Sequence, residues 1–278
     1  MADLVTFIAS MEKINITKKI GKVIIAGAGP GDAELITIKL QKRLAEADVI
    51  ICDRLVNPDI ITLYAKIEVI VLNAGKQGYN DASIPQNEIN ELIVSHALQG
   101  HTVLRLKGGD VAFFSNVLDE LYAITANEIP FEIIPGITAA AGASAYTGIP
   151  LTARGFAQGV QWITFNPSAN YRPEKWKYLA ATNDTLVFYM ASKNVIHLAE
   201  LLLRYMGKKD VGLAIVEQAT TPHQKVNITT LKRCAVDFKD KQFSSPSLVI
   251  VGDVVNLYHQ FKWFNGENDG SLFKELEK

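Results

Sequence analysis

A glycine-rich turn, Gly27-Ala28-Gly29-Pro30-Gly31-Asp32, has the residue types and spacing in this chain that most clearly point to chemistry. It follows the apolar run Val23–Ala26 and precedes a segment with helical periodicity, so it is expected to join a buried parallel strand to a helix. Glycines let the backbone approach a ligand closely, because no Cβ intervenes. A dinucleotide-binding fingerprint would need glycine where this chain has Asp32. That carboxylate would repel a pyrophosphate, and it suits a cation or a ligand with an amine.

Three more turns of this kind follow apolar runs. Asp53-Arg54 follows the run 49–52, Gly108-Gly109-Asp110 follows the run 103–107, and Pro135-Gly136-Ile137-Thr138-Ala139 follows the run 131–134. In open α/β sheets, ligands bind outside the carboxyl ends of the strands. Each turn alone is more often just a loop. Together the four predict a single ligand-binding cleft.

The elements that must position these turns alternate along the chain. Strands are predicted at 22–27, 48–52, 68–72, 102–106, 131–134, 159–165, 185–189, 211–217, 224–230 and 247–251, and helices at 34–47, 86–99, 116–127, 137–146, 174–181 and 194–206. This order predicts an α/β protein with mostly parallel sheets. From residue 159 the strands alternate polar and apolar residues, which indicates a second sheet with antiparallel members.

The best break between domains is at Ile134-Pro135-Gly136. We therefore expect a leader at 1–20, a first α/β domain at 21–134, a second at 135–264 and a polar, frayed tail at 265–278. The uncharged stretch 133–153 is interrupted by prolines and glycines. It fits a buried helix between two turns better than a membrane span.

Composition limits the function classes. The chain has 278 residues, 48% of them hydrophobic, which allows one large or two medium cores. The net charge of −1 predicts no nucleic-acid partner. Five scattered histidines and two distant cysteines lack metal-ligand spacing, so no metal is expected. No signal peptide is evident, and the cysteine usage fits a reducing, cytoplasmic compartment.

A resemblance to a known family emerges when further segments are taken in order. They are the glycine turn 27–32, Ala47–Ile50, Asp53–Val56, Gly75-Lys76, Pro85–Asn90, Arg105–Asp110, Pro135–Ala139, Gly148–Thr152, Val187–Met190, Ser245-Pro246 and Val251-Gly252. Over residues 21–264 the chain resembles the S-adenosylmethionine-dependent tetrapyrrole methyltransferases. Within that family it is most similar to the members that methylate uroporphyrinogen III at the start of the sirohaem and cobalamin branch.

The resemblance implies a fold, a reaction and an assembly. It implies two α/β domains with the active site in the cleft between them, and a homodimer. It implies transfer of methyl groups from S-adenosyl-L-methionine to C2 and C7 of uroporphyrinogen III, which gives precorrin-2 and S-adenosyl-L-homocysteine. The partner is then a small tetrapyrrole, with no metal, nucleic acid or membrane.

The resemblance also assigns residues. For the cofactor the matched positions are Pro30, Gly108, Gly109, Asp110, Phe113, Thr138, Ala139, Met190 and Ala219. The family's proton acceptor falls on Asp53 and its proton donor on Lys76. Because the substrate carries many carboxylates, Arg54, Arg105, Lys107 and Arg154 are its expected cationic contacts.

Some positions depart from the family pattern. Arginines of the family are replaced by Gln77 and Asn116, and a histidine is replaced by Ala153. A later precorrin or another anionic tetrapyrrole therefore stays open as the methyl acceptor. Two other classes also stay open. One is an NAD-dependent oxidoreductase, which Asp53 favours by its distance from the glycine turn. The other is a binding protein that has lost catalysis.

Overall fold

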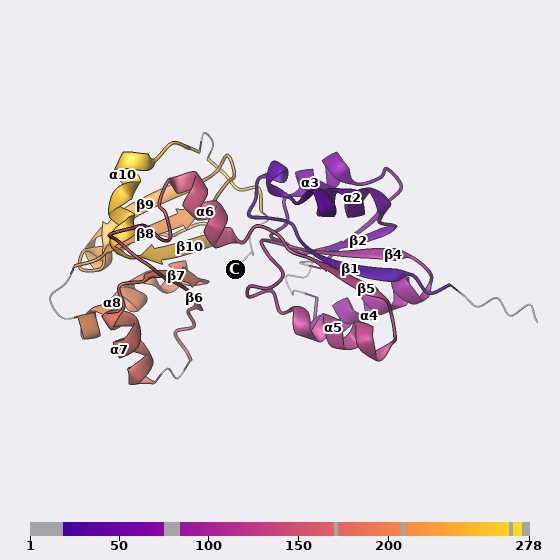
Figure 1. Cartoon of the computed structure of the whole chain (residues 1–278), viewed down its shortest axis with the longest axis horizontal. Helices are drawn as coiled ribbons and strands as arrows, with labels where there is room; N and C mark the ends of the chain where they lie inside the picture. Colours follow the sequence, from indigo (N-terminus) through magenta and orange to yellow (C-terminus); the bar gives the residue numbers. More distant parts are fainter. Residues whose placement is uncertain (1–18, 75–83, 170–171, 207–209, 267–268, 274–278) are drawn as a thin grey trace, which may run out of the picture.

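The structure is a computed structural model that describes residues 19–74, 84–169, 172–206, 210–266 and 269–273. It contains two five-stranded sheets, each with helices on both faces (Figure 1). The predicted class, α/β with a parallel sheet and a mixed one, is confirmed. The expected domain limits stay predictions, although β1–β5 all belong to one sheet and β6–β10 to the other.

The first sheet is wholly parallel, with strand order β3-β2-β4-β1-β5. Its strands are β1 (Lys22–Gly27), β2 (Val49–Cys52), β3 (Ile70–Asn73), β4 (Thr102–Lys107) and β5 (Phe131–Ile134). Strands β1, β2 and β4 are apolar and largely buried, as expected where helices cover both faces. This arrangement brings the ends of β1, β2 and β4 side by side.

Helices of two pairs cover the first sheet. On one face lie α2 (Ile38–Glu46) and α3 (Pro58–Tyr64), which pack on even-numbered residues such as Ile24 and Leu104. On the other lie α4 (Gln86–Leu98) and α5 (Val117–Ala126), which pack on odd-numbered residues such as Val23 and Val103. Because side chains alternate across a strand, residues 105 and 107 of β4 also face α4 and α5.

The second sheet has the order β6-β7-β10-β8-β9, in which β6 and β7 pair in parallel and the other pairs are antiparallel. Its strands are β6 (Val160–Thr164), β7 (Thr185–Tyr189), β8 (Gly212–Glu217), β9 (Lys225–Thr230) and β10 (Ser247–Val251). One face packs on α7 (Pro173–Ala181), α8 (Val195–Met206) and α9 (Cys234–Asp237). The other packs on α6 (Ala139–Thr147), η3 (Asp253–Leu257) and α10 (Tyr258–Phe261).

Two local differences from the sequence-based expectations stand out. The helix expected at 34–47 is split into the 3₁₀ turn η1 (Ala33–Leu35) and α2, because Thr37 is an extended residue that caps α2 with its side chain. Helix α3 was missed. The sequence nevertheless contains a signal for its start, because Asn57 can cap a helix and Pro58 follows at the first helical position.

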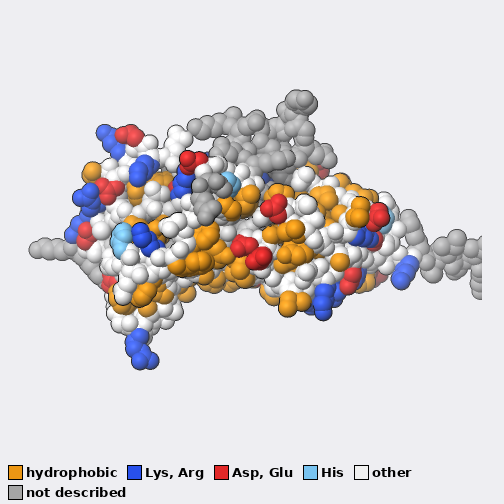
Figure 2. Space-filling model, turned by 90° about the horizontal axis from the view of Figure 1, so that it is seen from above, with side chains coloured by type: hydrophobic (Ala, Val, Ile, Leu, Met, Phe, Trp, Pro, Cys, Tyr) orange, Lys and Arg blue, Asp and Glu red, His pale blue; other side chains and the backbone are white. Residues whose placement is uncertain are grey.

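Surface charge and apolar character are unevenly spread. On the face shown in Figure 2, basic side chains lie toward the two ends, and hydrophobic side chains with a few acidic ones occupy much of the middle. Among the described residues, no helix is both long and apolar enough to cross a membrane.

Candidate functional site

The turns after β1, β4 and β5 interlock through their glycines. Gly29 N–H donates to the Gly109 carbonyl at 3.1 Å, and Gly109 N–H donates back to the Gly29 carbonyl at 2.7 Å. A Cβ on Gly27 or on Gly136 would stand 2.5 or 2.3 Å from the Gly109 carbonyl oxygen. The glycines at these positions are thus required by the close packing of three turns on one another.

A cavity of about 420 Å³ lies between the two sheets and is lined in part by these turns. All nine residues that the family resemblance assigned to the cofactor line it: Pro30, Gly108, Gly109, Asp110, Phe113, Thr138, Ala139, Met190 and Ala219. They come from segments as far apart in the sequence as residues 30 and 219. The volume is within the range of small-molecule sites, about 300–1,000 Å³.

One side of the cavity is polar. Asp110, only 7% exposed, accepts hydrogen bonds from Ala112 N–H and from Gly136 N–H, each at 2.7 Å. These bonds join the turn after β4 to the turn after β5. Each carboxylate oxygen keeps a second lone pair, so Asp110 can also accept from an ammonium group.

The second sheet and the loops beside it contribute a largely apolar part of the wall. This part includes Val216, Ala219, Phe243, Pro246 and Leu248. A ligand with one polar, charged end and one flat, apolar end would match these two parts of the cavity.

The start of α6 is tied to the second sheet at the cavity wall. The Thr138 hydroxyl and the Tyr189 phenol are hydrogen-bonded at 2.8 Å, and Ala140 N–H donates to the same phenol at 3.1 Å. Burial raises the pKa of Tyr189, so the phenol stays neutral. Tyr189 belongs to the segment Val187–Met190 that carries the family resemblance, but the sequence assigned no role to it.

Backbone strain gathers around two of the predicted cofactor positions. Met190 has a φ of +58°, and Gln218 and Thr220, on either side of Ala219, have φ values of +45° and +69°. Left-handed backbone at residues other than glycine is costly and is concentrated at ligand sites. Met190 is 66% exposed and lines the cavity, so its strained backbone lies at the cavity wall.

Asp32 has a different role from the one its type suggested. Its carboxylate caps η1 by accepting from Glu34 N–H at 2.8 Å, and it accepts from the Tyr146 phenol at 2.6 Å. Its own N–H donates to the Thr220 hydroxyl at 3.0 Å. Asp32 therefore joins the first glycine turn to α6 and to the loop after β8, and it is not among the residues that line the cavity.

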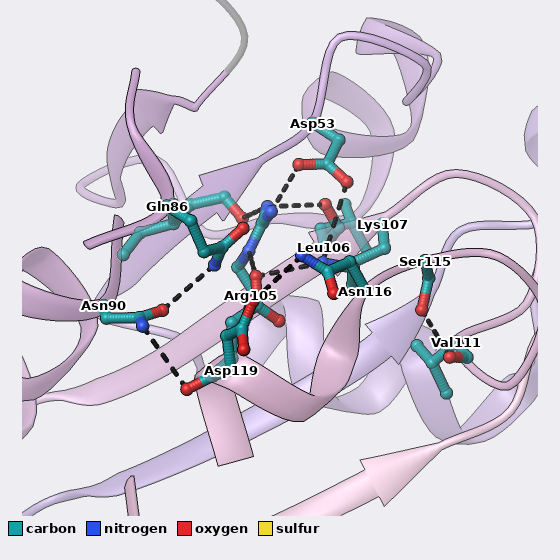
Figure 3. Close-up of polar contacts among 12 residues, drawn as sticks. Asp53, Gln86, Asn90, Arg105, Leu106, Lys107, Val111, Ser115, Asn116 and Asp119 are labelled. Atoms are coloured by element: carbon teal, nitrogen blue, oxygen red, sulfur yellow. Dashed lines mark hydrogen bonds and ion pairs between the residues drawn. The ribbon is translucent and has the colours of Figure 1, made fainter. Parts of the chain in front are cut away.

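Asp53 belongs to a buried ionic network beside the cavity (Figure 3). It is bonded to the Arg105 guanidinium, and the Lys107 ammonium lies 4.0 Å from its other oxygen. Glu120 on α5, fully buried, accepts from Arg105 Nε at 2.8 Å and from Lys107 Nζ at 2.9 Å. Burial lowers the pKa of Arg105, but Asp53 and Glu120 raise it by more. The network holds two cations and two carboxylates.

The four expected substrate cations lie in three different settings. Arg54 lines the cavity, and burial lowers its pKa. Arg105 and Lys107 are each 2% exposed and face α5, away from the cavity. Arg154 is exposed in the turn closed by the Ala153–Ala157 bridge and is not part of the lining. Lys76 and Gln77 lie outside the described residues.

Several lining residues were missed by sequence reasoning, among them a lysine and a phenylalanine. Lys193, in η2 (Ser192–Asn194), and Phe273, near the C-terminus, both line the cavity. Neither belongs to a motif, and only the folded chain brings them to the cleft. Among the residues that the structure describes, no cluster of three or more potential metal ligands is present.

Comparison with known proteins agrees with this architecture. The family model described as Tetrapyrrole (Corrin/Porphyrin) Methylases matches residues 22–235. A siroheme synthase from Tolumonas auensis is 40% identical over 247 residues, which are 89% of this chain and 52% of that protein. Siroheme synthase 2 from Aeromonas salmonicida is 41% identical over 252 residues, or 91% and 52% of the two chains. The chain spans about half the length of these curated relatives.

Solved structures show the same similarity. The uroporphyrin-III-C-methyltransferase from Thermus thermophilus superposes with a TM-score of 0.71 at 30% identity, covering 88% of this chain and 98% of that one. A structure of the Thermus enzyme complexed with S-adenyl homocysteine gives 0.70 at 32% identity, with 86% and 100% covered. On this fold, these turns and these matches, the chain belongs to the tetrapyrrole (corrin/porphyrin) methylase family.

Proposed function

We propose that this chain transfers methyl groups from S-adenosyl-L-methionine to C2 and C7 of uroporphyrinogen III, giving precorrin-2. One observation carries the proposal. The nine positions matched to the family's cofactor site, from Pro30 to Ala219, line one cavity between the two sheets. The named relatives, a uroporphyrin-III-C-methyltransferase and siroheme synthases, support the same acceptor. The proposed homodimer and cytoplasmic location stay predictions.

The cavity fits this methyl donor by its chemistry. When bound, S-adenosylmethionine supplies a methyl group on a sulfonium cation. Asp110 accepts hydrogen bonds from the ammonium group of S-adenosylmethionine, and the apolar part of the wall packs against the adenine ring. Pro30, Gly108 and Gly109 form the floor, where the absence of side chains on the glycines allows close approach.

The glycine turn is poorly suited to a dinucleotide. The N–H groups of Ala28, Gly29 and Gly109 all donate to carbonyls of neighbouring turns, at 2.7–3.1 Å. Asp32 N–H is bonded to Thr220, and Pro30 has no N–H. A pyrophosphate needs such donors free at a helix N-terminus. This bonding argues against the NAD-dependent alternative.

The chain's own groups have distinct tasks in the proposed reaction. Asp53 accepts the proton that the tetrapyrrole loses as it rearranges after methylation, and Arg105 and Lys107 hold this carboxylate in place and balance its charge. Lys76 is the proposed proton donor. Arg54, together with Lys193, faces the carboxylates of the substrate at the cavity, and Arg154 is proposed to meet them outside it. Most of the rate enhancement is then due to positioning of the two reactants.

A second acceptor is favoured by one observation. Asn116, where the family has arginine, caps α5 with a left-handed backbone (φ +50°), and its amide donates to Asp119 at 3.1 Å. Asparagine tolerates this conformation better than arginine does. The loss of a cation here would suit a tetrapyrrole with a different set of carboxylates, such as a later precorrin.

The proposal is tested by titration calorimetry and an anaerobic assay. S-adenosylhomocysteine should bind the purified chain, and NAD should not. Uroporphyrinogen III incubated with methyl-labelled S-adenosylmethionine should gain two methyl groups by mass spectrometry. Binding without methyl incorporation would indicate that the chain methylates another acceptor. A preference for NAD would overturn the proposed methyltransferase function.

A further inference from the structure

The last residues that the structure describes, Asp269–Phe273, return to the cavity between the sheets. Sequence reasoning expected a polar, frayed tail here. Instead, Phe273 is only 3% exposed and lines the cavity. In Figure 1 the yellow end of the chain leaves α10 and comes back toward the first half of the molecule. This segment lies beyond residues 22–235, which the family model matches.

Several contacts hold this segment on the loop after β8. Lys225 Nζ pairs with Asp269 Oδ1 at 2.7 Å, and Gln218 Nε2 donates to the Gly270 carbonyl at 2.9 Å. Within the segment itself, Phe273 N–H donates to the Ser271 hydroxyl at 3.1 Å, and that hydroxyl donates to the Phe273 carbonyl at 2.8 Å. The segment is thus fixed next to Ala219, one of the proposed cofactor residues.

Residues just before it are also packed. The Trp263 indole N–H donates to the Ala145 carbonyl at 2.8 Å, and the Phe264 ring lies 4.9 Å from the Tyr146 ring. A Cβ on Gly266 would stand 2.4 Å from the Gln224 carbonyl oxygen. The path of the chain toward the cavity is therefore set by contacts on both α6 and the loop at 218–225.

Phe273 shapes the apolar side of the cavity. It shares the lining with the apolar residues Phe243, Pro246 and Leu248. About 420 Å³ stays open with Phe273 in place, which is enough for a small ligand. The ring therefore acts as a wall of the site and leaves room for the ligand.

We propose that Phe273 forms part of the surface on which the adenine ring of the cofactor packs, and that Asp269–Phe273 is a strap that positions it. This inference rests on the proposed function, since it assumes an adenosyl ligand. Flat apolar rings pack well against aromatic side chains, typically in offset or edge-to-face geometry. The C-terminal strap would then contribute to cofactor affinity directly.

Phe273→Ala should weaken S-adenosylhomocysteine binding about tenfold by titration calorimetry, the loss expected for one aromatic contact. 5′-Methylthioadenosine keeps the adenine but lacks the amino-acid end, and its affinity should fall by the same factor. The KM for S-adenosylmethionine should rise by a similar factor while kcat changes less. Phe261→Ala, an exposed phenylalanine of α10 outside the lining, is the matched control and should leave affinity unchanged.

The outcomes separate this inference from the proposed function. If the unmodified chain binds no S-adenosylhomocysteine, both fail. If it binds and Phe273→Ala binds equally well, only the role of the strap is overturned. Tighter binding by Phe273→Ala would show that the ring occupies ligand space, and this also overturns the inference. If Phe273→Ala does not fold, Phe273→Leu carries the test, with a smaller loss of about threefold expected.

Discussion

At the scale of single residues, the proposed cofactor contact Asp110 and the proposed proton acceptor Asp53 lie in different surroundings. Asp110 faces the cavity, whereas Asp53 is bonded to Arg105 beside it. Asp53 is not among the residues that line the cavity, so the two proposed roles fall on separate groups. Binding and proton transfer should therefore respond to different substitutions.

Asp53→Asn tests this separation. Removal of the base should lower kcat by about 10²–10⁴-fold, the usual contribution of a general base. The Kd for S-adenosylhomocysteine should stay within about twofold, because the site of binding is untouched. Asp240→Asn, an exposed carboxylate, is the control. An unchanged kcat in Asp53→Asn would remove Asp53 from the mechanism.

The proposed cofactor positions were assigned through the family resemblance, and several of them lie in turns that follow strands. Gly108, Gly109 and Asp110 follow β4 directly, so a strand prediction already places them at the cleft. The substrate cations were harder to place, since residue type does not reveal the face of a strand. Arg105 and Lys107 read as ligand contacts, but the alternation of β4 directs them onto α5.

At the scale of elements, buried ion pairs connect β4 with α5. Arg105 and Lys107 on the strand share Glu120 on the helix, and all three are almost fully buried. Such a pairing adds little compared with apolar packing, but a broken one is costly. The ion pairs therefore avoid a large loss of stability only while all of their charged members are present.

Glu120→Ala should therefore lower the free energy of unfolding by about 3–5 kcal/mol, because two buried cations would lose a partner. Chemical denaturation with urea measures this loss. Glu91→Ala, which removes an exposed carboxylate from α4, should change stability by less than about 0.5 kcal/mol. A small loss in Glu120→Ala would mean that water or Asp53 takes over the pairing.

The fold class and the kind of strand pairing could be predicted from the sequence, but the order of the strands within each sheet could not. Alternating strands and helices predict parallel pairing, and a change of polar pattern after residue 159 predicts the mixed second sheet. The C-terminal strap could not be predicted, because its contacts join residues far apart in the chain, as Gln218 with Gly270 does. Its polar composition is typical of a free tail.

At the scale of the whole molecule, the two sheets are joined by a few specific bonds. The Tyr146 phenol of α6 donates to Asp32 of the first glycine turn, and Asp32 N–H donates to Thr220 beyond β8. Burial, followed by the Asp32 carboxylate, raises the pKa of Tyr146 to about 12. These bonds join the first glycine turn to α6 and to the loop after β8.

Tyr146→Phe should lower the free energy of unfolding by about 1.5 kcal/mol at neutral pH, since a hydrogen bond to a carboxylate is lost. The raised pKa adds a pH dependence. The neutral phenol's contribution is complete below pH 10, the ordinary pKa, and is lost as pH rises toward about 12. The stability difference between the unmodified chain and Tyr146→Phe should shrink over that range.

Urea denaturation at several alkaline pH values measures this difference. Tyr122→Phe, an exposed tyrosine of α5, should show no such difference at any pH. A difference that is constant from neutral pH to pH 12 would mean that the Tyr146 phenol does not sense Asp32.

The mutual bond between Gly29 and Gly109 also bears on the thermodynamics of ligand capture. Because these turns bond to one another, the floor of the cavity is already ordered before a ligand arrives. Preorganisation of this kind spares the entropy that a loop loses when it becomes fixed on binding. The entropy cost of ordering protein groups should then fall mainly on exposed side chains of the cavity wall, such as Met190.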